Sequence, residues 1–374
     1  MIYFDNAATT KVIKDALETA NYYFTEKYFN PSALYHGGLE VKNDLNGARR
    51  TLLNGLGAEG KIYFTSGGTE ADNLAFFGTK KRKNSTIIIS AGEHAAVYQS
   101  ALSLKNQGFE VKFAPVDGSG KVIEDQFEKL LDDKVSLVSI MHVSNESGAV
   151  NDINKLAETT KRICPGALFH SDGVQAGGKI PVRLGRFIDL YSLSAHKIGA
   201  PKGTGALCVA KGIYLTPVVV GGGQEEGVRS STENTPGIMA YAKAFSLANA
   251  ALRDNLKKVT EIRDYLFDKI SEFDDIKMVS DKTCSPYILC FASGSLRGEV
   301  LQHALERKDI IVGTGSACSS NKATRRVPEA LGLSGKYIDG VVRLSFSAFS
   351  TMEEARSFIE TFTEIYKELK KYVG

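Results

Sequence analysis

Short, continuously apolar segments alternate with amphipathic segments between about residues 60 and 220. The apolar segments predict strands at Lys61–Thr65, Thr86–Ser90, Glu110–Ala114, Ser136–His142, Ala167–His170, Leu190–Leu193 and Ala206–Ala210. Several of them, such as Thr86–Ser90, are apolar at nearly every position, which is typical of strands buried on both faces of a parallel sheet. Intervening segments such as Thr69–Thr79 and Ile153–Arg162 have helical character. The alternation predicts an α/β fold.

A different pattern follows Pro236. A helical region is expected from about 237 to 273, followed by strands near 286–292 and 341–346 and a final helix from about 352. This order predicts a smaller α+β unit. Because 374 residues exceed what one minimal core needs, we expect two domains. The large one spans 12–255, and the small one combines 1–11 with 256–374.

The composition narrows the class of protein. Hydrophobic residues make up 43% and charged residues 24% of the chain, as in globular proteins that dissolve in water. The net charge of +3 gives no general affinity for nucleic acid. We find neither a signal peptide nor an apolar run near the ~18 residues of a membrane span. The 5 cysteines form no C-x-x-C pair and no metal spacing. We therefore expect a cytoplasmic protein with reduced thiols, without a membrane anchor and without a bound metal.

The segment Ser192–Gly205 carries the most specific chemistry. It places Lys197 directly after an apolar strand and before a glycine-rich turn, among hydroxyl groups and the imidazole of His196. Partial burial near other cations lowers the pKa of a lysine, and a neutral amine can form a Schiff base with a carbonyl.

Polar residues follow five of the predicted strands. Ligands of open α/β sheets bind outside the carboxyl ends of the strands, so these residues belong together. They are the turn Ser66–Thr69, then Glu93 and His94, Asn145 and Glu146, Asp172 and Gln175, and finally Ser194, His196 and Lys197. Each of these residues also has an ordinary structural interpretation when taken alone. The turn and Asp172 could be helix caps, His94 a histidine in a loop, and Lys197 a surface lysine.

Taken together, these residues predict a pyridoxal 5'-phosphate (PLP) site. The cofactor needs a lysine for the Schiff base and a carboxylate at its pyridine nitrogen. It also needs a ring that stacks on it and a phosphate cradle. Lys197, Asp172, His94 and the turn 66–69 offer these four groups. A nicotinamide-dependent dehydrogenase is disfavoured, because the first βα turn lacks G-x-G-x-x-G.

Five collinear motifs resemble those of the cysteine desulfurases, within the class V aminotransferases of PLP fold type I. They are Tyr3–Thr10, Thr65–Asn73, Met141–Glu146, Ser194–Lys197 and Gly315–Cys318, and the resemblance extends from residue 3 to about 350. It implies a large domain with a mostly parallel seven-stranded sheet flanked by helices, and a smaller C-terminal α+β domain.

The resemblance also implies roles for single residues. Lys197 would carry the cofactor, His94 would stack on its ring, and Asp172 would pair with the ring nitrogen. Gln175 and Asn145 would bond the phenolic oxygen, while Gly68, Thr69, Ser194 and His196 would bind the phosphate. Arg343, helped by Asn145, would bind the substrate carboxylate. Thr232 would reach the phosphate of a partner subunit, which implies a homodimer with shared active sites.

Cys318 distinguishes this family from ordinary transaminases. The resemblance implies that it accepts sulfur from L-cysteine as a persulfide, leaving L-alanine, and that His94 moves a proton near the substrate thiol. The small and polar residues near 313–326 predict a mobile loop. Cys208 and Cys290 are expected to be buried in strands, and Cys164 and Cys284 receive no role.

Three alternatives remain open at this level. The chain could be a selenocysteine lyase, a cysteine sulfinate desulfinase, or a sulfur-relay binding protein without catalytic power. Two departures from the family pattern bear on rate and acceptor: Ile198–Pro201 lacks the family's tyrosine, and Ser345–Phe349 lacks its Gly-Arg pair. The sulfur-acceptor protein also stays open among iron–sulfur scaffolds, tRNA-thiolation proteins and carriers for thio-cofactors.

Overall fold

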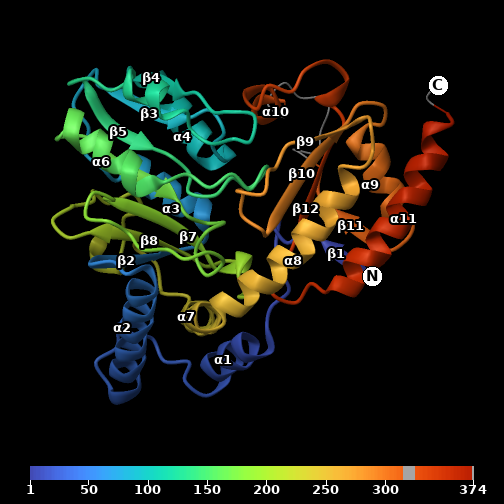
Figure 1. Ribbon diagram of the computed structural model, residues 1–374. Coiled ribbons are helices and arrows are strands. Elements are labelled where there is room, and N and C mark those ends of the chain that lie inside the picture. Colours follow the sequence, from blue (N-terminus) through green and yellow to red (C-terminus); the bar gives the residue numbers. More distant parts are fainter. Residues whose placement is uncertain (315–324, 373–374) are drawn as a thin grey trace.

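A computed structural model describes residues 1–314 and 325–372, which form one large sheet, two small sheets and the helices around them (Figure 1). The helices are α1 (Lys14–Thr25), α2 (His36–Leu56), α3 (Gly68–Phe77), α4 (Ala95–Asn106), α5 (Glu124–Glu128), α6 (Ile153–Ile163), α7 (Thr235–Ala250), α8 (Leu252–Ile270), α9 (Gly298–Glu306), α10 (Arg326–Ala330) and α11 (Met352–Lys370). The strands are β1 (Ile2–Phe4), β2 (Gly60–Thr65), β3 (Thr86–Ser90), β4 (Glu110–Ala114), β5 (Val135–Ser139), β6 (Leu168–Asp172), β7 (Leu190–Ser194), β8 (Gly205–Ala210), β9 (Ile276–Met278), β10 (Ile288–Ser293), β11 (Ile310–Val312) and β12 (Val341–Ser345).

The large sheet has seven strands in the order β2-β8-β7-β6-β5-β3-β4. Strand β8 runs antiparallel to both of its neighbours, and the other pairs are parallel. The predicted α/β fold with a mostly parallel seven-stranded sheet is therefore confirmed.

Helices cover both faces of this sheet, as the continuous apolar strands require. Side chains of a strand alternate between the two faces, and β3 shows the result. Ile87 and Ile89 pack in a cluster with residues of α3 and α4. Ile88 packs in the opposite cluster with residues of α2, α6 and α7.

A second core lies around the three-stranded sheet β12-β10-β9 and the two-stranded sheet β1-β11 (Figure 1). Helices α8 and α11 pack on it through side chains such as Leu266 and Phe362. The N-terminal residue Phe4 is buried in the same core. The cluster around the large sheet also includes Val279, Cys290 and Val341, so the domain division near residue 255 stays a prediction.

Two local expectations differ from the structure. The helical region expected from 237 to 273 is two helices, because the backbone leaves the helix at Ala251, where φ is −96° and ψ is 9°. Strand β5 ends at Ser139 instead of continuing to His142. The reason is that the N–H of Met141 donates to the carboxylate of Glu93, which takes the place of a strand partner.

The strand ends bring the predicted site residues to one edge of the large sheet. Asp172 and Ser194 are the last residues of β6 and β7, and Lys197 lies in the short 3₁₀ turn that follows β7. Among the described residues, we find no helix with the length and apolar character needed to cross a membrane.

Candidate active site

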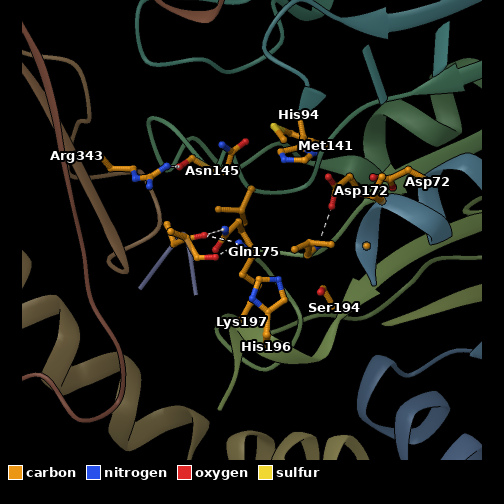
Figure 2. A pocket seen from close by; sticks show the side chains of 16 residues that line it. Asp72, His94, Met141, Asn145, Asp172, Gln175, Ser194, His196, Lys197 and Arg343 are labelled. Atoms are coloured by element: carbon orange, nitrogen blue, oxygen red, sulfur yellow. Dashed lines mark hydrogen bonds between the residues drawn. The ribbon is translucent and has the colours of Figure 1, made fainter. Parts of the chain in front are cut away.

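A cavity of about 390 Å³ opens at this edge of the sheet (Figure 2). Its volume lies within the ~300–1,000 Å³ of typical small-molecule sites. It is lined by Ala7, Ala8, Gly68, Thr69, Asp72, His94, Met141, Val143, Asn145, Asp172, Val174, Gln175, Ser194, His196, Lys197 and Arg343. The described residues to which the resemblance gives a role line it, except Thr232. Of the other polar residues after the strands, Ser66, Glu93 and Glu146 do not line it. Thr232 lines a second cavity of about 230 Å³ together with Arg229 and Glu233, and Cys318 lies outside the described residues.

Lys197 reaches into the cavity from the side opposite His94 (Figure 2). Its Nζ donates to the backbone oxygens of Ala7 and Ala8 at 2.6 and 2.8 Å. Burial and the charge of Arg343 lower the pKa of Lys197 to about 8, against the opposing charges of Asp172 and Asp5. A large share of Lys197 is therefore neutral in mildly alkaline solution.

The turn after Lys197 has a conformation that favours glycine at position 199. Gly199 has φ of +83°, a conformation that costs an L-residue strain. A Cβ at this position would lie 2.7 Å from Cγ2 of Ile13. The N-terminal segment also holds the turn, since Thr10 Oγ1 donates to the oxygen of His196 and accepts from the N–H of Gly199. A glycine is required here by both conformation and space.

One end of the cavity is a ready anion site. The N-terminus of α3 opens here with Gly67 as the N-cap and no side-chain cap, so its N–H groups face the cavity with the positive end of the helix dipole. The buried Oγ of Ser194 has no hydrogen-bond partner within the described parts of the chain. A Cβ at position 68 would lie 2.8 Å from the side chain of Val174. The backbone at the start of α3 can therefore lie this close to Val174 only with a glycine at position 68.

Two buried carboxyl groups lie at the back of the cavity. Asp172 Oδ1 accepts from the N–H of Val174. Burial raises the pKa of Asp172, while the charges of His94 and Lys197 lower it. No role was predicted for Asp72, yet its carboxyl group lines the same cavity. Burial, followed by the charge of Asp172, raises the pKa of Asp72 well above the usual range. Its place on α3, three residues after Thr69, was the available signal.

His94 is the N-cap of α4, and its Nδ1 accepts from the N–H of Ala96. The other ring nitrogen, Nε2, therefore carries the proton. The turn before it is fixed from α10, where Arg326 donates to the oxygens of Ala91 and Glu93 and its guanidinium lies 4.2 Å from the ring centroid of Tyr98.

The buried carboxyl group of Glu93 is expected to make the stability of the folded protein depend on pH. This carboxyl group is fully buried; Oε1 accepts from Ser90 Oγ and the N–H of Met141, and Oε2 has no partner. Burial, with a contribution from Asp172, raises the pKa of Glu93 to about 8 from 4.5. The folded state thus binds the proton more tightly than the unfolded state, so this contribution to stability is present below pH ~4.5 and is lost as the pH rises to 8.

Glu93→Gln mimics the protonated acid. We compare the melting temperature of this variant with that of the wild type at pH 5 and at pH 9. From pH 5 to pH 9, we expect the difference to shift in favour of the variant by about 2 °C or more. Thermal unfolding of both proteins at the two pH values measures this shift. Glu158→Gln, on the exposed face of α6, serves as the control and should show no such shift. An equal difference between Glu93→Gln and the wild type at both pH values would contradict the prediction.

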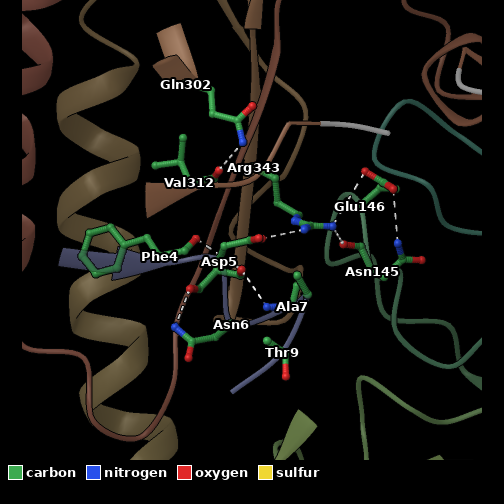
Figure 3. Close-up of polar contacts among 12 residues, drawn as sticks. Phe4, Asp5, Asn6, Ala7, Thr9, Asn145, Glu146, Gln302, Val312 and Arg343 are labelled. Carbon is green, nitrogen blue, oxygen red and sulfur yellow. Dashed lines mark hydrogen bonds and ion pairs between the residues drawn. The ribbon is translucent and has the colours of Figure 1, made fainter. Parts of the chain in front are cut away.

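Arg343 faces the opposite end of the cavity from Asp172 (Figure 2). Figure 3 shows its guanidinium held from two sides: Nη2 donates to Asp5 Oδ1 at 2.8 Å and Nη1 donates to the oxygen of Asn145 at 2.8 Å. Glu146 lies 4.0 Å from Nη1. Among the described residues, its buried Nε has no hydrogen-bond partner.

The chain belongs to the class V aminotransferase family, whose model, "Aminotransferase class-V", matches residues 2–358. Members of this family generally depend on PLP. Among the curated relatives, the cysteine desulfurase IscS of Methanosarcina thermophila is 37% identical over 99% of this chain and 93% of its own length. A NifS/IcsS protein homolog of Lactobacillus delbrueckii subsp. bulgaricus is 41% identical over 99% of this chain and 98% of its own length. A solved structure titled NifS-like protein has a TM-score of 0.91 and 34% identity, over 98% of this chain and 99% of its own chain.

Proposed function

We propose that this chain is a PLP-dependent cysteine desulfurase, which converts L-cysteine to L-alanine and transfers the sulfur to an acceptor protein. The observation that carries the proposal is the single cavity in which Lys197, Asp172, His94 and Arg343 meet. The relatives that bear the name cysteine desulfurase support it.

The residues present fit the cofactor. The buried hydroxyl group of Ser194, a glycine cradle at Gly68 and the free N-terminus of α3 suit a phosphate. Thr69 and His196 would complete this phosphate site; burial and nearby lysines lower the pKa of His196 to about 4, so it is a neutral donor. Asp172 would hold the proton of the pyridine nitrogen, and His94 would cover the ring. Asn145 and Gln175 would bond the phenolic oxygen. Bound PLP would supply an electron sink for the negative charge that develops at the substrate Cα.

Arg343 would bind the substrate carboxylate at the other end of the cavity. Its guanidinium is a charged donor, and Asp5 and Asn145 fix the guanidinium plane from behind. Charge-assisted hydrogen bonds of this kind orient a carboxylate strongly. The side chain of Asn145 also lines the cavity and would help to place the substrate.

Lys197 and His94 would handle the protons. Neutral Lys197 would take the Cα proton of the substrate, and its lowered pKa favours the neutral form that a base requires. His94 carries its proton on Nε2 and lies on the other side of the cavity, where it would exchange a proton with the substrate thiol.

Cys318 would accept the sulfur. In the net reaction the Cβ–S bond of L-cysteine breaks, an S–S bond forms on Cys318, and the thiol hydrogen ends on the Cβ of L-alanine, so no outside oxidant or reductant is needed. The acceptor would belong to iron–sulfur cluster assembly, tRNA thiolation or thio-cofactor synthesis in the cytoplasm. A homodimer, in which Thr232 reaches the phosphate of the partner subunit, is part of the same proposal.

Substrate comparison tests the proposal. Purified protein reconstituted with PLP is given L-cysteine, L-selenocysteine or L-cysteine sulfinate, and alanine formation and protein-bound persulfide are measured. We expect alanine from L-cysteine together with one persulfide per active site. Turnover confined to selenocysteine or sulfinate would favour the related lyases. Failure to bind PLP would leave only the sulfur-relay alternative.

A further inference from the structure

Lys179 is a buried lysine for which the sequence offered no role. It lies four residues after Gln175, in the turn that follows β6, and the residue is 5% exposed. Its Nζ donates to Gln175 Oε1 at 2.7 Å and lies 5.9 Å from the ring centroid of Tyr287. Within residues 1–314 and 325–372 it has no carboxylate partner. Because burying an unpaired ammonium is costly, its presence beside the cavity calls for a reason.

The contacts of Lys179 determine which way the amide of Gln175 points. Lys179 Nζ donates to Oε1, so the oxygen of the amide faces Lys179. The other end of the amide agrees, since Gln175 Nε2 donates to the backbone oxygen of Ala7, which can only accept. The reversed amide would set its oxygen against the oxygen of Ala7. Lys179 thus fixes Gln175 as a donor toward the cavity.

The same backbone oxygen joins this arrangement to Lys197. Ala7 O accepts from Gln175 Nε2 at 2.9 Å and from Lys197 Nζ at 2.6 Å. Once Ala7 has taken one hydrogen of Nε2, the second is the remaining donor of Gln175. Because Gln175 lines the cavity, this hydrogen is available to a ligand there.

We propose that Lys179 is a positioning residue that holds the amide of Gln175 with its N–H groups toward the cavity, so that Gln175 donates to the phenolic oxygen of bound PLP. The inference rests on the proposed function. A fixed donor at this oxygen stabilises its negative charge and makes the neighbouring imine nitrogen on Lys197 more acidic. Burial and the charges of Lys197 and Arg343 lower the pKa of Lys179 to about 7, which agrees with its closeness to both groups.

Lys179→Met tests the inference, because methionine keeps most of the volume and removes the donor. In the holoenzyme, we expect the pH midpoint of the visible absorbance of lysine-bound PLP to rise by about 0.5–1 unit. The dissociation constant of the apoenzyme for PLP, measured by fluorescence, should rise roughly three- to tenfold. In a Gln175→Met background, Lys179→Met should add little to either change.

Lys81→Met is the matched control. Lys81 is another largely buried lysine, but its Nζ donates to backbone oxygens and the hydroxyl at the end of α3, with partners at Phe76 and Thr79. Its loss should lower the melting temperature and leave the absorbance midpoint unchanged. Should Lys179→Met fail to fold, Lys179→Leu, which also lacks a donor, takes its place in the same measurements.

The outcomes separate the two proposals. A wild-type protein without lysine-bound PLP would refute the proposed function itself. If the wild type binds PLP but Lys179→Met leaves the midpoint unchanged, the positioning role is wrong. Lys179→Met could also shift the absorbance midpoint equally in the wild-type and Gln175→Met backgrounds. That result would overturn the positioning role, because Lys179 would then act without the amide of Gln175.

Discussion

Replacing Lys197 with alanine should give a folded protein that holds no covalently bound cofactor. Lys197 Nζ is the amine that faces His94 across the cavity, and its pKa of about 8 makes it reactive. The variant also loses the proposed base for the Cα proton, so alanine formation should fall by at least roughly 10²–10⁴-fold. Borohydride reduction followed by peptide mass spectrometry measures the attachment, and the wild type should carry the label on the peptide that contains Lys197.

The matched control is Lys202→Ala, in the same glycine-rich segment but exposed. It should keep the visible absorbance and the label. The informative contrary result is a label on Lys179 in the wild type, since this second amine of lowered pKa lies close by. Such a label would make Lys179 the cofactor lysine and would overturn the assignment of Lys197.

Replacing Cys318 with alanine should separate the two halves of the reaction. The variant should keep the lysine-bound PLP absorbance, because every group proposed to hold the cofactor remains. Protein-bound persulfide should fall to background after addition of L-cysteine, since the thiol that accepts the sulfur is gone. Labelling with a persulfide-selective alkylating reagent and mass spectrometry measures this loss.

Cys284→Ala controls for the loss of a thiol as such. Burial raises the pKa of Cys284 to about 11, and that of Cys208 to about 12, so neither supplies much thiolate near neutral pH. Cys284→Ala should form persulfide like the wild type. Unchanged sulfide release by Cys318→Ala would show that sulfur leaves by another route and would refute the role of Cys318.

The sequence predicted the large sheet and most of the cavity lining, for physical reasons that can be named. Strands such as Thr86–Ser90 are apolar on both faces because helices cover both faces of the sheet. Asp172, Ser194 and Lys197 could be grouped because the ends of parallel strands meet at one edge. The predicted boundaries agree with the structure at Ser90 and at Ala114. Ala114 is followed by Pro115, which cannot donate a hydrogen bond to a continuing strand.

Other features depend on contacts that residue types do not reveal. The backbone oxygens of Ala7 and Ala8 contact Lys197 from a segment 190 residues earlier, and any residue can offer a backbone oxygen. The break at Ala251 is invisible in a run of good helix formers, because packing on two different cores decides it. From the sequence alone, Lys179 would be taken for a surface lysine, and only the structure shows that it is buried.

The N-terminal segment carries a consequence for the order of assembly. Strand β1 pairs with β11 across about 300 residues, with Ile2 opposite Ile310. Asn6 and Ala7 bond to Ser345, and Asp5 pairs with Arg343 (Figure 3). During synthesis the N-terminal residues therefore cannot form these contacts until residues near the C-terminus have been made. The large sheet can already form from local βα units before that point. The oxygen of Ala7 takes its place beside Lys197 only when the chain is almost complete, so a ribosome-bound nascent chain would carry the sheet before it could carry the finished cavity.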